Sequence, residues 1–233
     1  MKNLICLAVS AIIALSGCSA SSDKLPAVTD ENGAVLPPVR VLEDVSCHGD
    51  LARSYTFETA FSEAEVVARI KVGNWLYEDN DIMSTFFEAE TLQCFKGDIP
   101  EKFILKQEGS SEWIEDSFPL FTYGNELLVF MSKGDSKGYE SRYPKKYDTF
   151  YWLIGAYITF FDVSYDNNGN RYYADRYGFM GKTMNISSKD DFYSEVYEYA
   201  VKADPFLGSI RNKEYYYSYI FSEDDVISLM KSF

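Results

Sequence analysis

The sequence predicts a mainly β protein whose folded part begins as a small closed barrel and ends in an α+β extension. Apolar and polar residues alternate with the two-residue period of half-buried strands. The predicted strands are short, turn residues join them and one strand bends, which favours a closed barrel over an open sheet. Beyond residue 133 the chain becomes rich in tyrosine, and a hairpin signal and helix-start signals follow.

Two segments carry most of the strand signal of the predicted barrel. Residues 66–72 alternate apolar with polar side chains, so one face of this strand is expected to be buried. In the next strand Phe87 and Ala89 point inward, and the parity then changes so that Leu92 and Cys94 become the inward pair. A change of parity within a strand indicates a β-bulge and a bend.

Two further strands complete the barrel core, which we assign to residues 47–133. Residues 96–98 read Lys-Gly-Asp and have turn chemistry. A short strand over residues 103–107 follows. Residues 127–131 are continuously apolar, as expected of a strand that is covered on both faces.

Residues 134–233 are predicted to form a Tyr-rich hairpin and helical extension. Residues 151–163 predict one long strand, and the Asp-Asn-Asn-Gly-Asn segment after it predicts a hairpin turn with a return strand to residue 179. Capping-box patterns predict helices after Ser188 and Ser222. The last helix is expected to place three apolar residues inward, namely Val226, Met230 and Phe233.

Residues 1–17 have the layout of a secretory signal peptide, with Lys2, an apolar run and small residues before Cys18. The apolar run is about twelve residues long, shorter than the roughly twenty that a membrane-spanning helix needs. The Leu-Ser-Gly-Cys sequence is similar to the lipobox of bacterial lipoproteins, in which the cysteine is lipidated and becomes the mature N-terminus. The alternative is an ordinary signal peptide followed by a chance cysteine.

Residues 18–46 are predicted to be a lipidated flexible tether, because they contain prolines and polar residues and show no helical or strand period. The lipobox resemblance implies that the protein is lipid-anchored in the cell envelope. Ser19 resembles the residue that directs lipoproteins to the outer membrane, if the cell is Gram-negative.

Composition and motifs exclude several classes of function. The chain has a formal net charge of -14 and no cluster of Lys and Arg, so we expect neither nucleic-acid binding nor electrostatic docking to anionic lipid. His48 is the only histidine and cannot by itself complete a metal site, which needs three or four ligands. Phosphate-binding and nucleophile-elbow motifs are absent from the sequence. We therefore expect no metal and no cofactor.

Two cysteines remain once the signal peptide and the lipid are accounted for. Cys47 and Cys94 would lie in a compartment where disulfides persist. A Cys47–Cys94 disulfide would close a loop of about 48 residues and contribute roughly 4 kcal/mol in the chain-entropy model. The alternative is two free thiols.

Three segments carry a resemblance to a known family: residues 60–72, residues 94–98 (Cys-Phe-Lys-Gly-Asp) and residues 123–130. They resemble bacterial relatives of the netrin-like domain, a group that includes the tissue inhibitors of metalloproteinases. The resemblance implies a five-stranded barrel of the oligonucleotide/oligosaccharide-binding (OB) type with a flanking helix. The inhibitors act through an N-terminal cysteine, and Cys47 is internal, so that mechanism is not implied here.

The sequence leaves two classes of function open. In the first, the protein is a non-enzymatic binding or structural module for a protein or glycan partner. Aromatic residues in excess of what a small core needs would carry the contact. These candidates are Tyr139, Tyr143, Tyr147, Trp152, Tyr215 and Tyr217. In the second, it is an enzyme that acts on envelope glycan through paired carboxylates, such as Glu88 with Glu90 or the acidic residues 112, 115 and 116. Simpler interpretations also stay open. The carboxylates could form a solvated acidic surface, and the aromatic residues could face a core.

Overall fold

The computed structural model describes residues 28–29, 35–36, 54–79, 83–110, 120–135, 149–156, 158–189 and 219–233. The protein is mainly β, as predicted. Its strands are β1 (Val28–Thr29), β2 (Val35–Leu36), β3 (Val66–Asp79), β4 (Ser84–Lys96), β5 (Lys102–Glu108), β6 (Glu126–Asp135), β7 (Thr149–Leu153), β8 (Phe160–Tyr165), β9 (Arg171–Asp175) and β10 (Tyr219–Ser222). The helices are α1 (Phe57–Glu63) and α3 (Glu223–Met230), with a 3-10 turn η1 (Gly181–Thr183).

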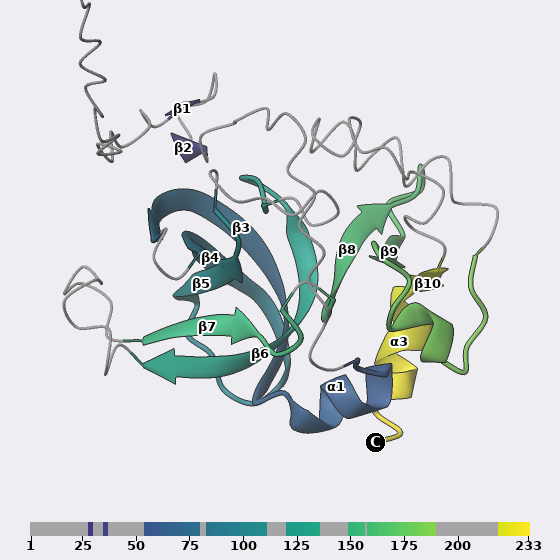
Figure 1. The fold of residues 1–233 in the computed structure, drawn as a ribbon. Helices are drawn as coiled ribbons and strands as arrows, with labels where there is room; N and C mark the ends of the chain where they lie inside the picture. Colours follow the sequence, from purple (N-terminus) through teal and green to yellow (C-terminus); the bar gives the residue numbers. More distant parts are fainter. Residues whose placement is uncertain are drawn as a thin grey trace, which may run out of the picture.

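Five strands close into a ring (Figure 1). β3 pairs with β4, β4 with β5, β7 with β6 and β6 with β3, all antiparallel. β5 and β7 pair in parallel and close the ring. The predicted barrel core ends at residue 133. The strand that closes the ring, β7, lies beyond it, in the Tyr-rich part of the chain.

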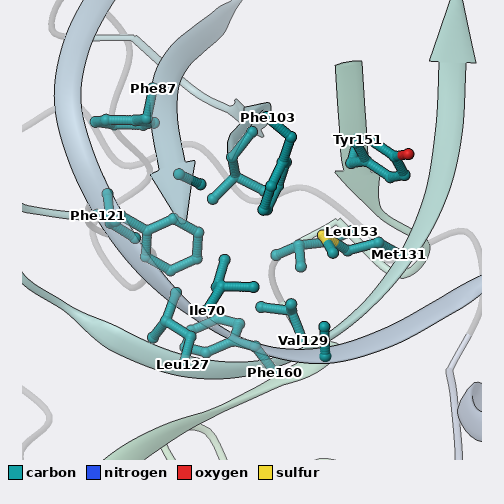
Figure 2. Packing of buried hydrophobic residues seen from close by; sticks show 14 of the residues in the cluster. Ile70, Phe87, Phe103, Phe121, Leu127, Val129, Met131, Tyr151, Leu153 and Phe160 are labelled. Atoms are coloured by element: carbon teal, nitrogen blue, oxygen red, sulfur yellow. The ribbon is translucent and has the colours of Figure 1, made fainter. Parts of the chain in front are cut away.

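The inward side chains of the ring form an apolar core (Figure 2). Six of the inward positions predicted for the first two strands are confirmed, since Val66, Ala68, Ile70, Val72, Phe87 and Ala89 all belong to this core. Leu92, also predicted to point inward, is only half-buried and does not belong to it. Aromatic rings meet edge to face across the core, with 5.2 Å between the centroids of Phe103 and Tyr151 and 5.1 Å between those of Phe121 and Phe160. Such edge-to-face pairs add to the stabilisation that burial of their area provides.

The predicted bulge in the second strand is confirmed. In the register of β4 with β3, Leu92 and Phe95 have no opposite residue, so each of them shifts the pairing. Cys94 lies opposite the buried Ala68, but it is exposed, so the prediction that it points into the core is wrong. Cys94 lies in the part of β4 that extends past its pairing with β5, which ends at Glu90 opposite Lys102.

A second apolar core lies on the other face of β6. The prediction that residues 127–131 are covered on both faces is confirmed, because all five side chains are fully buried. Leu128 and Phe130 pack there against α1, α3 and the strands β8, β9 and β10. Helix α1 follows its N-cap Thr56, whose hydroxyl accepts the Thr59 N–H over 3.1 Å. This capping presents Phe57 to Phe130, with 5.3 Å between their ring centroids.

The prediction of one continuous strand over residues 151–163 is wrong, because this segment contains parts of two strands, β7 and β8. β7 and β8 both run along β6, but the chain leaves β6 between them. Ile154 N–H donates to the Phe130 carbonyl and Phe130 N–H donates to the Thr159 carbonyl, and the described residues 155, 156 and 158 lie outside the sheet. Ala156 in this excursion has φ 54°, a backbone conformation that is incompatible with a strand.

The predicted hairpin and final helix are confirmed. β8 and β9 pair around the turn, where the Asp166 carboxylate accepts the N–H groups of Asn168 and Asn170. The return strand ends at Asp175 rather than at residue 179. Helix α3 begins after its N-cap Ser222. Val226 and Met230 are buried, but Phe233 lies past the helix end and is 54% exposed, so its predicted inward position is wrong.

The remaining predictions fall mostly outside the described residues. These include the signal peptide, Cys18 and the helix expected after Ser188. Within the predicted tether, β1 and β2 form an antiparallel pair and β2 contacts β3.

Candidate functional site

A hollow of about 750 Å³ opens over β3, β4 and β5, near the start of β7. Its lining mixes charged, amide and aromatic side chains. Its polar and charged lining residues include Lys71, Asn74, Glu88, Glu90, Lys102 and Tyr123. The size is that of a ligand site rather than of a packing defect.

An irregularity in β3 shapes one wall of the hollow. Between the pairs Val72–Ala89 and Trp75–Phe87, Gly73 and Asn74 of β3 face the single residue Glu88 of β4. A Cβ atom on Gly73 would lie 3.1 Å from the Glu88 carbonyl oxygen, so this close approach favours glycine. The Asn74 amide donates to the Glu88 carboxylate over 3.1 Å.

Three exposed side chains of alternating charge cross this wall. Lys71 lies opposite Glu90 in the β3–β4 register, and Glu90 lies opposite Lys102 in the β4–β5 register. Directly opposite residues on neighbouring antiparallel strands have Cβ atoms about 5 Å apart. Within the described part of the chain, none of the three takes part in an ion pair. We call these three residues the charge row.

Aromatic side chains form another part of the lining. Tyr123 is 43% exposed and lies in the turn before β6. Gly124, with φ 88°, makes this turn possible, and its N–H donates to the Val72 carbonyl over 2.8 Å. Tyr151 and Phe103 line the hollow from the ring core. Burial raises the pKa of Tyr151, and the negative charges of Asp98 and Glu65 raise it further, so this phenol stays neutral.

Of the six aromatic residues predicted to form a binding surface, the structure describes one. Trp152 is half-buried and packs on the outside of the ring against a cluster of Phe86, Ile104 and Phe150. Tyr139, Tyr143, Tyr147, Tyr215 and Tyr217 lie outside the described residues. The aromatic surface therefore stays a prediction. Its first three members precede Thr149 in the chain, and Thr149 lines the hollow.

Both carboxylates of the predicted Glu88–Glu90 pair line the hollow. They lie two residues apart on β4, so their Cα atoms are about 7 Å apart and their side chains leave the same face of the strand. A glycosidase pair instead flanks its substrate from two sides. Glu112, Glu115 and Asp116 lie outside the described residues, and among those that the structure describes no group of three or more His, Cys, Asp or Glu side chains could hold a metal ion.

Cys94 is an exposed thiol whose Sγ lies 3.3 Å from the Lys96 carbonyl oxygen. Cys47 lies outside the described residues, so the Cys47–Cys94 disulfide stays a prediction.

A second polar cluster lies at the edge of the second core and was not predicted. Arg171 donates to Glu223 over 2.5 Å, and Tyr173 donates to the same carboxylate over 3.1 Å. Burial and the nearby Glu223 charge raise the pKa of Tyr173 well above its usual range. Tyr165 extends the cluster by donating to Glu126 over 2.8 Å. These groups satisfy one another, which indicates a structural role that joins α3 to β6, β8 and β9.

Comparisons of this chain with protein-family models, with curated proteins and with solved structures return no match. Of the helices in the described part of the chain, none has the length and apolar character to cross a membrane.

The residues of the hollow could be named from the sequence only in part. Glu88 and Glu90 stand out as paired acids, and Tyr123 belongs to a segment that carries the family resemblance. Lys71 and Lys102 were missed, because only the strand register brings them beside Glu90.

Proposed function

We propose that this protein is an envelope-anchored lipoprotein that works as a non-enzymatic binding module and holds a protein or glycan partner in the hollow over β3, β4 and β5. The observation that carries the proposal is the hollow itself. It combines an exposed tyrosine with unpaired charged groups, and its volume suits a ligand.

The order of strand pairing supports an OB-type barrel. We number the ring strands β3, β4, β5, β6 and β7 from one to five in chain order. Around the ring they then follow the order 1-2-3-5-4, and the fourth strand pairs with the first. OB-type barrels bind their ligands on the face of the second and third strands. Here these strands are β4 and β5, and both line the hollow.

The role of the Phe-Lys-Gly-Asp turn supports the netrin-like resemblance. The Lys96 ammonium donates to the carbonyl oxygens of Phe61 and Ser62 over 2.6 and 2.8 Å, so the turn holds the end of helix α1 against the strands. A helix fastened to the ring is what the resemblance implies.

Lipid anchoring rests on the Leu-Ser-Gly-Cys sequence and has its own test. Metabolic labelling with an acyl probe should tag the wild-type chain, and Cys18→Ser should abolish the tag, because the variant lacks the acceptor thiol. Equal labelling of the two chains would refute anchoring at Cys18. Fractionation of labelled cells would then show whether the protein reaches the outer membrane.

The binding proposal is tested by capture of envelope proteins and glycans with the Cys18→Ser chain as bait. Tyr123→Ala should abolish capture, because it removes the exposed ring from the hollow. Phe233→Ala is the matched control, since it removes an aromatic side chain that is also exposed but lies at the C-terminus beside Phe61. Equal capture by both variants would refute binding in the hollow.

The second candidate is an envelope glycan-acting enzyme, and the observation that favours it is the presence of Glu88 and Glu90 in one hollow. Their common strand face favours binding over hydrolysis. Incubation with cell-wall glycan decides between the two. Turnover that disappears in Glu88→Gln or Glu90→Gln would establish the enzyme and overturn the proposed binding module.

A further inference from the structure

We propose that the ligand of the hollow is a peptide segment that carries both ammonium or guanidinium groups and carboxylate groups. This inference rests on the proposed binding function and names the class of partner.

The charge row is available to a ligand. Lys71, Glu90 and Lys102 are exposed, all three line the hollow, and in the described structure no ion pair occupies them. Their signs alternate across three neighbouring strands at a spacing of about 5 Å. A ligand that crosses the strands therefore meets positive, negative and positive charge in turn.

The balance of charge excludes ligands of a single sign. Glu88 is the fourth charged residue of the lining, so two lysines face two glutamates. A polyanion would be attracted by Lys71 and Lys102 and repelled by Glu88 and Glu90, and a polycation would meet the reverse. Like-charge contacts of this kind cost several kcal/mol in an interface and suppress the wrong partners.

Desolvation disfavours a neutral glycan. A bound sugar would cover the charge row and remove water from three ionised groups without returning opposite charge, and burial of an unpaired charge is costly. A peptide with both kinds of side chain returns a charge-assisted hydrogen bond to each group. The aromatic side of the hollow, with Tyr123, then packs against the apolar parts of the same peptide.

The experiment is selection from a library of random hexapeptides displayed on beads, with the full Cys18→Ser chain as the labelled bait. We expect the recovered peptides to contain basic and acidic residues together, well above their frequency in the library. For one such peptide, replacement of its charged residues by glutamine should raise the dissociation constant at least tenfold. Addition of 0.5 M salt should raise it by a similar factor. Recovery of peptides with one sign of charge, of uncharged peptides or of no peptides would overturn the inference.

A charge-exchange variant tests whether binding depends on the order of the charges in the charge row or only on the net charge. Lys71→Glu combined with Glu90→Lys leaves the net charge at the wild-type value but changes the order of signs, and it should abolish binding of the selected peptide. Lys182→Met, outside the hollow, should leave binding unchanged. Both variants should keep the wild-type melting temperature within a few degrees, and Glu90→Gln replaces the exchange if it does not fold. Unchanged peptide binding in the charge variants would overturn the inference.

Glycan binding gives a result that separates the two proposals. Tyr123-dependent capture of a neutral oligosaccharide, with no peptide recovered from the library, would overturn the peptide assignment and leave the binding module in place. If the protein captures no peptide, protein or glycan in a way that depends on Tyr123, the proposed binding function itself is refuted.

Discussion

At the scale of single residues, buried polar groups define the turn that follows β9. Asp175 is 1% exposed, and its carboxylate accepts the N–H groups of Tyr177, Gly178 and Gly181 over 3.2, 2.9 and 2.5 Å. Burial raises the pKa of Asp175 to about 6, because removal of the charged form from water outweighs these hydrogen bonds. One carboxylate therefore organises the backbone between β9 and η1 and titrates close to neutral pH.

We predict that the Asp175 contribution to the free energy of unfolding is largest below about pH 4 and decreases as the pH rises through about 6. The folded-state pKa lies above the ordinary value of 3.8, so ionisation favours the unfolded chain. About two pKa units correspond to roughly 3 kcal/mol. Urea unfolding of the wild type and of Asp175→Asn should show their stability difference shrinking by this amount over the whole range from about pH 3 to about pH 7. A constant or growing difference would contradict the prediction.

We also predict a large loss of stability for Arg176→Met. The guanidinium of Arg176 is 1% exposed and donates to the Asp162 carboxylate over 2.6 and 2.8 Å. Removal of one partner leaves the other charge buried without compensation, which costs about 3 to 5 kcal/mol. Denaturant unfolding measures the loss, and adding Asp162→Asn should restore part of it. A double variant as unstable as the sum of the single ones would contradict this explanation.

At the scale of elements, the connection between α1 and the end of β4 holds the first helix in place. Lys96 donates to two carbonyl oxygens at the end of α1, and Gly97 follows with φ 78°. A Cβ atom at Gly97 would lie 2.0 Å from the Glu65 carbonyl oxygen. The helix and the strand therefore meet through a turn that tolerates no side chain at its second position.

We predict that Lys96→Met lowers the free energy of unfolding by about 1 to 3 kcal/mol, because it removes charge-assisted hydrogen bonds and leaves carbonyl groups unsatisfied.

Gly97→Ala should lower the free energy of unfolding by more than about 2 kcal/mol, since it adds backbone strain to a steric clash. Lys102→Met, at an exposed lysine, serves as the control and should change stability by less than about 0.5 kcal/mol. A Gly97→Ala variant of wild-type stability would show that the turn adapts.

At the scale of the whole molecule, β6 joins the two cores. Its residues pair with β3 on one edge and with β7 and β8 on the other. Leu127, Val129 and Met131 face the ring core, whereas Leu128 and Phe130 face α1 and α3. The two cores therefore share one strand and should unfold together.

We predict that the amides of residues 127–131 exchange with solvent most slowly, because both edges of this strand are paired and both faces are buried. Their exchange free energies should equal the global free energy of unfolding from denaturant titration. The amides of β10, which pairs with β9 at the end of the sheet, provide the comparison and should exchange faster. Faster exchange in β6 than in β10 would contradict a shared central strand.

Local patterns in the sequence determined much of the fold. Alternation identified the inward residues of β3, continuous apolarity identified the doubly covered β6, and the Asp166 and Ser222 signals located a hairpin and a helix start. These features depend on neighbours within a few residues, which is why they can be read without a structure. The same reasoning failed at Cys94 and Ala156, where the outcome depends on the end of β5 and on the contact of residues 154 and 159 with Phe130.

Only the tertiary structure decided how the ring closes and where the hollow lies. β7 comes from a segment that the sequence assigns to the extension, and its parallel partner β5 is more than forty residues earlier in the chain. Lys71, Glu90 and Lys102 become neighbours through the strand register, which long-range pairing sets. Sequence patterns specify which face of an element is apolar, but they do not specify which other element covers it. For that reason most strands of the ring were predictable from the sequence, whereas the arrangement of Lys71, Glu90 and Lys102 beside one another was not.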